Sequence, residues 1–111
     1  MGVVFRAHDT RLDRDVALKL LVSDTDVDPG QRRRFLQEAR AASALNHPNI
    51  IQVFDIDEHE GIDFIAMELL SGKTLDELIP SRELQANEAL RYGMQIAEAL
   101  VAAHQAGFIH R

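Results

Sequence analysis

Two charged residues, Lys19 and Glu38, lie in stretches that otherwise suit a protein interior. Lys19 interrupts the apolar run VALKLL at residues 16–21, which predicts a strand, and a lysine buried there alone would cost free energy. Glu38 borders the apolar stripe of a predicted helix, so its carboxylate is expected to face the sheet. Together they predict a lysine ammonium held by a glutamate carboxylate from a neighbouring element.

Each residue also has a simpler interpretation. On the solvent face of an edge strand, Lys19 would need no partner. Glu38 would pair with Arg34 one helical turn earlier, an interaction that contributes only about 0.2–0.5 kcal/mol. The sequence pattern leaves both alternatives open.

The pattern around these residues predicts the elements that would position them. Strands are expected at 3–9 and 16–21, joined by a polar hairpin connection. A helix is expected after Asp28, whose carboxylate caps it, with Pro29 at the first helical position. It would run to about Leu45, because Pro48 disfavours helix in the residue before it.

The second half of the chain predicts two more strands and two helices. Residues 49–70 fit two strands around a turn at 57–61, and a short helix is expected to end at Pro80. A long helix with an apolar face would end at Gly107. The strands form hairpins and do not alternate regularly with helices, so the predicted fold class is α+β with an antiparallel sheet. The apolar stripe of the last helix, if uncovered, invites aggregation or a partner.

Composition excludes several classes of function. The chain has 111 residues, which suits one domain or part of one. Its formal net charge of -6 argues against a nucleic-acid-binding surface, and the absence of cysteine excludes disulfides and thiolate metal sites. No apolar run approaches the roughly 20 residues that span a bilayer, and no secretory signal is present. The histidines form no recognised metal motif, so no metal ligand is predicted in this chain; they are His8, His47, His59, His104 and His110.

Five segments in order resemble successive motifs of the protein-kinase fold, most closely those of bacterial kinases of the eukaryotic-like Ser/Thr class. Together they span the whole chain; they are MGVVFRAHD, VALKLL, RFLQEARAASALNHPNI, FIAMELLSGKTL and HQAGFIHR. The resemblance implies a kinase-like N-lobe, an antiparallel sheet plus one regulatory helix, at residues 1–69. Residues 70–111 would be the end of the hinge and the first helices of the C-lobe.

The resemblance also implies roles around the nucleotide. Gly2 would be the last glycine of a glycine-rich loop whose earlier glycines are absent, and Val4 would lie over the base. Ala17 would lie against the adenine. Lys19 would hold the α- and β-phosphates, and Glu38 would orient Lys19.

Further along, Met67 matches the residue at the back of the nucleotide pocket, although core packing is its simpler interpretation. Glu68 to Leu70 match the hinge, whose backbone groups bond the adenine edge, and Gly72 would end it. Ala42 and Val53 match an apolar spine that links the helix to the sheet. His110 and Arg111 match the start of the catalytic-loop motif H-R-D, with His110 as a packing residue.

By this resemblance the parent activity is transfer of the ATP γ-phosphoryl group to Ser or Thr of a protein, in signalling. The aspartate base and the magnesium-binding Asn and Asp would follow Arg111, so a chain of these residues alone is expected to be inactive. The kinase part would be cytoplasmic, in a protein that can carry a membrane anchor elsewhere.

Two other classes of protein remain as alternatives. One is a non-catalytic, pseudokinase-like nucleotide-binding or regulatory module; retention of both Lys19 and Glu38 argues against it. The other is a small-molecule kinase that shares the fold, which the HPNI and MELLSGKTL segments disfavour.

Overall fold

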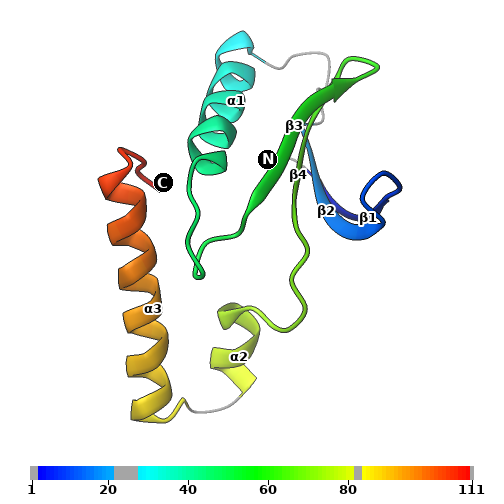
Figure 1. The fold of residues 1–111 in the computed structure, drawn as a ribbon. Coiled ribbons are helices and arrows are strands. Elements are labelled where there is room, and N and C mark those ends of the chain that lie inside the picture. Colours follow the sequence, from blue (N-terminus) through cyan, green and yellow to red (C-terminus); the bar gives the residue numbers. More distant parts are fainter. Residues whose placement is uncertain (1–2, 22–27, 82–83, 111) are drawn as a thin grey trace.

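A computed structural model describes residues 3–21, 28–81 and 84–110, and Figure 1 shows a sheet half and a helical half. The sheet half holds four strands and one helix, and the helical half holds two helices. In chain order the elements are β1 (Val3–Asp9), β2 (Arg14–Leu21), α1 (Pro29–Ser43), β3 (Val53–His59), β4 (Ile62–Glu68), α2 (Leu75–Ser81) and α3 (Ala86–Gln105). All strand pairs are antiparallel, which confirms the predicted α+β class.

The strand order β1-β2-β4-β3 places β2 inside the sheet. Lys19 lies opposite Val4 on β1 and opposite Ile65 on β4. Ala17 lies opposite Met67 in the same way. Because directly opposed residues, and residues two apart on a strand, share a face, all five side chains belong to one face of the sheet.

The β3–β4 hairpin is tighter than the sequence predicted. Its turn is Glu60 and Gly61 alone, with φ values of 50° and 79°. Two residues with positive φ form the two-residue hairpin connection whose twist matches that of the flanking strands. The predicted turn at 57–61 was therefore too long, since β3 continues through His59, and the predicted first strand was too early, since β3 begins at Val53.

The helix α1 begins as predicted. The Asp28 carboxylate accepts a hydrogen bond from the Gly30 backbone N–H at 3.1 Å, and Pro29 occupies the first helical position. The helix ends at Ser43, slightly before the predicted Leu45. Ala39 within the helix and Leu45 just after it are both buried.

The end of α2 differs from the prediction, because Pro80 lies inside the helix. A proline in the last turn removes one hydrogen bond, to the carbonyl of Asp76, and Asp76 is exposed, so water can satisfy that carbonyl.

The end of α3 confirms the prediction. Gly107 has φ 78°, its N–H donates to the His104 carbonyl at 3.0 Å, and the Phe108 N–H donates to the Ala103 carbonyl at 2.9 Å. This is the glycine-terminated Schellman arrangement.

Candidate functional site

Lys19 stands on an internal strand and is half-buried. The alternative of an edge-strand lysine is therefore wrong, because β1 and β4 flank β2 on both sides. Val4, Ala17 and Met67 share its face of the sheet. The structure thus brings together one cation and three apolar side chains that were predicted to contact the nucleotide.

These apolar residues differ in exposure along the face. Ala17 is only 7% exposed, whereas Val4 is 59% exposed. A methyl group at Ala17 leaves the face flat between its neighbours, and an exposed Val4 leaves apolar surface uncovered beside Lys19. A flat apolar surface next to an ammonium suits a ligand that joins a planar ring to phosphates.

The predicted hinge, Glu68 to Leu70, begins at the last residue of β4. The Glu68 backbone N–H donates to the Gln52 carbonyl at 2.9 Å, and a Glu68 carboxylate oxygen accepts from the Gln52 N–H at 3.2 Å. Leu70 is 60% exposed, and its backbone N–H and C=O have no hydrogen-bond partner within the described residues. Free backbone donors and acceptors at this edge are what an adenine base would require.

Glu38 does not pair with Lys19. Its side chain is exposed, and no ion pair joins it to Lys19 or to Arg34 within the part of the chain that the structure describes. It lines a hollow of about 420 Å³ between α1 and the segment after α3, together with Gly107, Phe108 and Ile109. The expectation that Glu38 faces the sheet is therefore not met in this conformation.

A different ion pair attaches α1 to the sheet. Asp63, near the start of β4, is the one buried polar or charged residue among those described, at 5% exposed. Its carboxylate accepts from Arg32 Nε at 2.5 Å and from Arg32 Nη2 at 3.0 Å. The bond to Asp63 and its negative charge raise the pKa of Arg32. The sequence held one signal for it, an aspartate inside the apolar strand IDFIAM.

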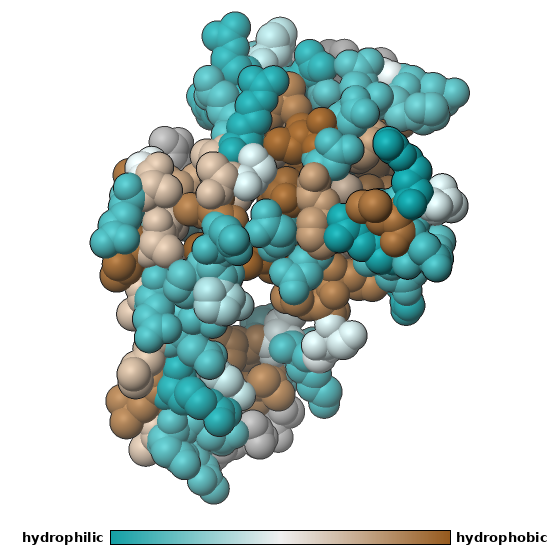
Figure 2. Space-filling model, viewed as in Figure 1, coloured by the Kyte–Doolittle hydropathy of each residue, from teal (hydrophilic) through white to brown (hydrophobic). Residues whose placement is uncertain are grey.

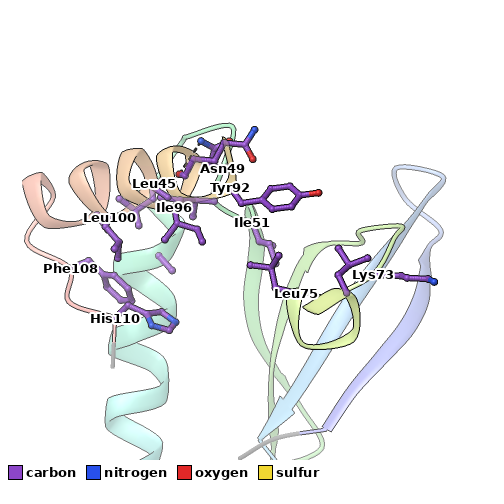
Figure 3. A pocket seen from close by; sticks show the side chains of 16 residues that line it. Leu45, Asn49, Ile51, Lys73, Leu75, Tyr92, Ile96, Leu100, Phe108 and His110 are labelled. Atoms are coloured by element: carbon purple, nitrogen blue, oxygen red, sulfur yellow. Dashed lines mark hydrogen bonds between the residues drawn. The ribbon is translucent and has the colours of Figure 1, made fainter. Parts of the chain in front are cut away.

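His110 lies at the apolar cavity between α3, the end of α1 and α2, which has a volume of about 760 Å³ (Figure 3). Figure 3 shows the imidazole beside Phe108, with Leu100 close to both. Ala42 also lines this cavity, and Val53 pairs with Met67 on the sheet. The cavity is separate from the Lys19 face.

Gly2 and Arg111, which the sequence also implicated, lie outside the described residues. Within residues 3–21, 28–81 and 84–110, no three His, Asp or Glu side chains are grouped so that they could hold a metal ion. In the same ranges, no helix combines the length and apolar character needed to cross a membrane.

The family model for the protein kinase domain matches residues 1–111. This chain belongs to the protein kinase domain family. Its sheet with α1 corresponds to the kinase N-lobe, and α2 and α3 correspond to the start of the C-lobe. The kinase domain of Mycobacterium tuberculosis PknI superposes with a TM-score of 0.85 at 34% identity, covering all of this chain and 45% of that one.

Curated bacterial kinases are also similar. The Bacillus subtilis serine/threonine-protein kinase PrkC is 43% identical over 112 residues, covering all of this chain and 17% of PrkC. The Myxococcus xanthus serine/threonine-protein kinase pkn3 is 46% identical over 114 residues, covering all of this chain and 21% of pkn3. The chain thus spans about a fifth of the length of these kinases.

Proposed function

We propose that this chain is the ATP-binding part of a protein serine/threonine kinase that transfers the γ-phosphoryl group of ATP to a protein hydroxyl. The observation that carries the proposal is the shared face of Val4, Ala17, Lys19 and Met67. The similarity to PrkC and pkn3, both named serine/threonine-protein kinases, supports the choice of Ser/Thr as acceptor. Because it would use ATP, this part of the protein would lie in the cytoplasm.

Each residue of this face has a distinct task in the proposal. Lys19 would contact the α- and β-phosphates, and Val4 and Ala17 would both pack against one side of the adenine plane. The Glu68 carbonyl and the backbone groups of Leu70 would bond the adenine edge, while Met67 closes the back of the site. Magnesium would neutralise phosphate charge, and its ligands would come from residues other than these 111.

Glu38 would orient Lys19, which requires the Glu38 turn of α1 to lie closer to the sheet than observed, while the first turn keeps its contact with Asp63. The carboxylate is exposed and has no ion-pair partner among the described residues, so this conformation corresponds to a site that is not yet assembled. The same observation favours a second candidate, a pseudokinase-like module that binds nucleotide or a partner without phosphoryl transfer.

The proposed boundary between the two parts lies at residues 69 and 70, directly after β4. Residues 1–69 would contact the phosphates and the adenine of the nucleotide. Residues 70–111 would begin the lobe that carries the catalytic loop, which starts at His110 and Arg111. Because the base and the magnesium ligands are not among these residues, a polypeptide of residues 1–111 is expected to transfer no phosphate.

Lysine labelling tests nucleotide binding directly. Lys19 and Lys73 are the only lysines in the chain. In the full natural polypeptide that carries residues 1–111, an acyl-phosphate derivative of ATP should acylate Lys19, and free ATP should suppress that labelling, while Lys73 serves as the internal control. Equal labelling of both lysines, insensitive to ATP, would contradict the proposed site.

Phosphoryl transfer separates the two candidates. The natural polypeptide incubated with magnesium and radiolabelled ATP should yield phosphoserine or phosphothreonine on itself or on casein. ATP-protected labelling of Lys19 without any phosphoamino acid would support the pseudokinase-like module. Phosphotyrosine alone would contradict the Ser/Thr assignment.

A further inference from the structure

The buried carboxylate of Asp63 lies on the Lys19 face of the sheet. Lys19 opposes Ile65, and Leu21 opposes Asp63, so the two charged residues project to the same side two positions apart along the ladder. At about 3.3 Å per residue this separation is roughly 7 Å along the strands. Whatever binds Asp63 therefore lies on the same face of the sheet as Lys19.

Arg32 from α1 is the group that binds Asp63. Its guanidinium donates twice to the Asp63 carboxylate and once, at 3.3 Å, to Glu58 on β3. Glu58 pairs with Asp63 in the ladder, so one arginine clasps both strands of the β3–β4 hairpin. A two-bond arginine–carboxylate contact fixes orientation as well as distance.

The anchoring of α1 is uneven along its length. Arg32 lies in the first turn, and Glu38 lies about 9 Å further along the axis at 1.5 Å per residue. Glu38 itself forms no ion pair among the described residues and lines the hollow between α1 and the segment after α3. The first turn is thus attached to the sheet by an ion pair, whereas no hydrogen bond or ion pair joins the Glu38 turn to the sheet within the described residues.

We propose that Arg32 and Asp63 are positioning residues for the nucleotide site: their ion pair holds the first turn of α1 against the sheet and sets how Glu38 stands relative to Lys19. This inference rests on the proposed function for its effect on catalysis. Its structural part, the placement of α1, does not.

A distance measurement tests the placement of α1 without relying on activity. Residues 1–111 contain no cysteine. In the full natural polypeptide, with any cysteine outside these residues replaced by serine, the pair Gln37→Cys and Thr10→Cys places one spin label on exposed α1 surface and one on the β1–β2 turn. Arg32→Gln should shift or broaden the distance distribution, and Arg32→Lys should do so less. Arg33→Gln is the matched control, because Arg33 is the neighbouring exposed arginine.

Kinetics tests the link to Glu38. Arg32→Gln is expected to lower kcat/KM for ATP by about 10- to 100-fold, the scale of a misplaced catalytic group. If Arg32 acts through Glu38, the same change in a Glu38→Gln background should cost less than about twofold, because groups that act as one unit are not additive. Asp63→Asn, if it folds by circular dichroism, should match Arg32→Gln.

The outcomes are distinct. Unchanged distance distributions in Arg32→Gln overturn the inference whatever the activity. Fully additive losses with Glu38→Gln overturn the positioning role and leave a stabilising ion pair. Absence of phosphoryl transfer and of ATP-protected labelling in the unmodified polypeptide defeats the proposed function, while the distance measurement still decides the placement of α1.

Discussion

The sheet β1–β4 and the helix α3 differ in how they cover their apolar side chains. Val16, Ala17 and Ile65 in the inner strands are each no more than 7% exposed. Along α3, by contrast, Leu90 is 68% exposed and Met94 is 64% exposed. Figure 2 shows the consequence, brown apolar side chains at the surface on the lower left, where Figure 1 places α3.

This contrast predicts that substitutions in the sheet and in α3 will affect activity and stability differently. The inner strands hold the predicted nucleotide residues on a packed support, so changes there act on chemistry and folding together. The helix α3 contributes one buried residue, Ala103, and an open cavity. Side chains of α3 therefore have room to change with little local penalty, and matched substitutions in the two regions measure the difference.

The largest difference is expected between the two lysines. In the natural polypeptide, Lys19→Met should lower phosphoryl transfer by about 100- to 1000-fold, the usual effect of removing a preorganised charged contact. Lys73→Met, at the cavity of the helical half, should stay within about threefold of the unmodified protein. Initial rates with radiolabelled ATP measure both. Equal losses in the two variants would show that the face of Lys19 has no special role.

The second difference concerns folding, and two isoleucines test it. Ile65→Ala in β4 should lower the free energy of local opening by about 2–5 kcal/mol, because it leaves a cavity in the packed sheet. Ile96→Ala on α3, where the side chain is 47% exposed, should cost less than about 1 kcal/mol. Amide hydrogen exchange of the strand and helix segments in the natural polypeptide measures these values. A larger loss at Ile96 would mean that a partner covers α3.

The strands and their face were predictable from local pattern. Alternation and turn residues located β1 and β2, and the motif VALKLL identified Lys19 as the residue to explain. The turn at 57–61 was overestimated because Asp57 and Glu58 are polar, yet polarity on an edge strand reports exposure to solvent, not chain reversal. Pro80 misled for a related reason, since the last turn of a helix tolerates a missing donor.

The placement of α1 was not predictable in the same way. Periodicity located Glu38 on the border of the apolar stripe but says nothing of how a helix is rotated or shifted on a sheet. In the structure that geometry involves the contact between Arg32 and Asp63, 31 residues apart. The pattern of one sequence marks Asp63 as unusual in an apolar strand but does not identify its partner, which explains why the site residues on strands lie together and the one on the helix does not.

Alanine substitutions at two glycines of the helical half should have smaller effects on the stability of α3, and these effects should be opposite in sign. Gly107→Ala should destabilise the end of α3 by about 1–2 kcal/mol, because φ at this position is 78°, where a Cβ is strained. Gly93→Ala, within α3, should stabilise the helix by about 0.5–1 kcal/mol, since nothing lies within 4 Å of the added methyl group. Amide exchange around Gly93 and at the C-terminal end of α3 distinguishes them. Destabilisation by Gly93→Ala would point to a surface that closes on α3.

The smallest effect is a pH dependence confined to the β1–β2 hairpin of the sheet half. The His8 imidazole bridges Asp15 at 2.9 Å and Asp13 at 3.0 Å, and Asp15 also accepts from Arg6 at 2.6 Å. The bonds to Asp15 and then Asp13 raise the pKa of His8 above its ordinary 6.5. The bond from His8 and then that from Arg6 lower the pKa of Asp15 below its ordinary 3.8.

The directions of the two pKa shifts define the pH range in which this hairpin is most stable. A raised histidine pKa contributes stability that is fully present below pH 6.5 and is lost as the pH rises through the folded value. A lowered aspartate pKa contributes stability that is present above pH 3.8 and is lost as the pH falls through the folded value. Amide protection of the hairpin should therefore be greatest between those two values and decline slightly toward pH 8, with α3 unaffected.

In an NMR titration of the His8 ring, Asp15→Asn should lower the midpoint most and Asp13→Asn less, while Asp57→Asn on β3 leaves it unchanged. A His8 midpoint at or below 6.5 in the unmodified protein would show that the bridge does not form in solution.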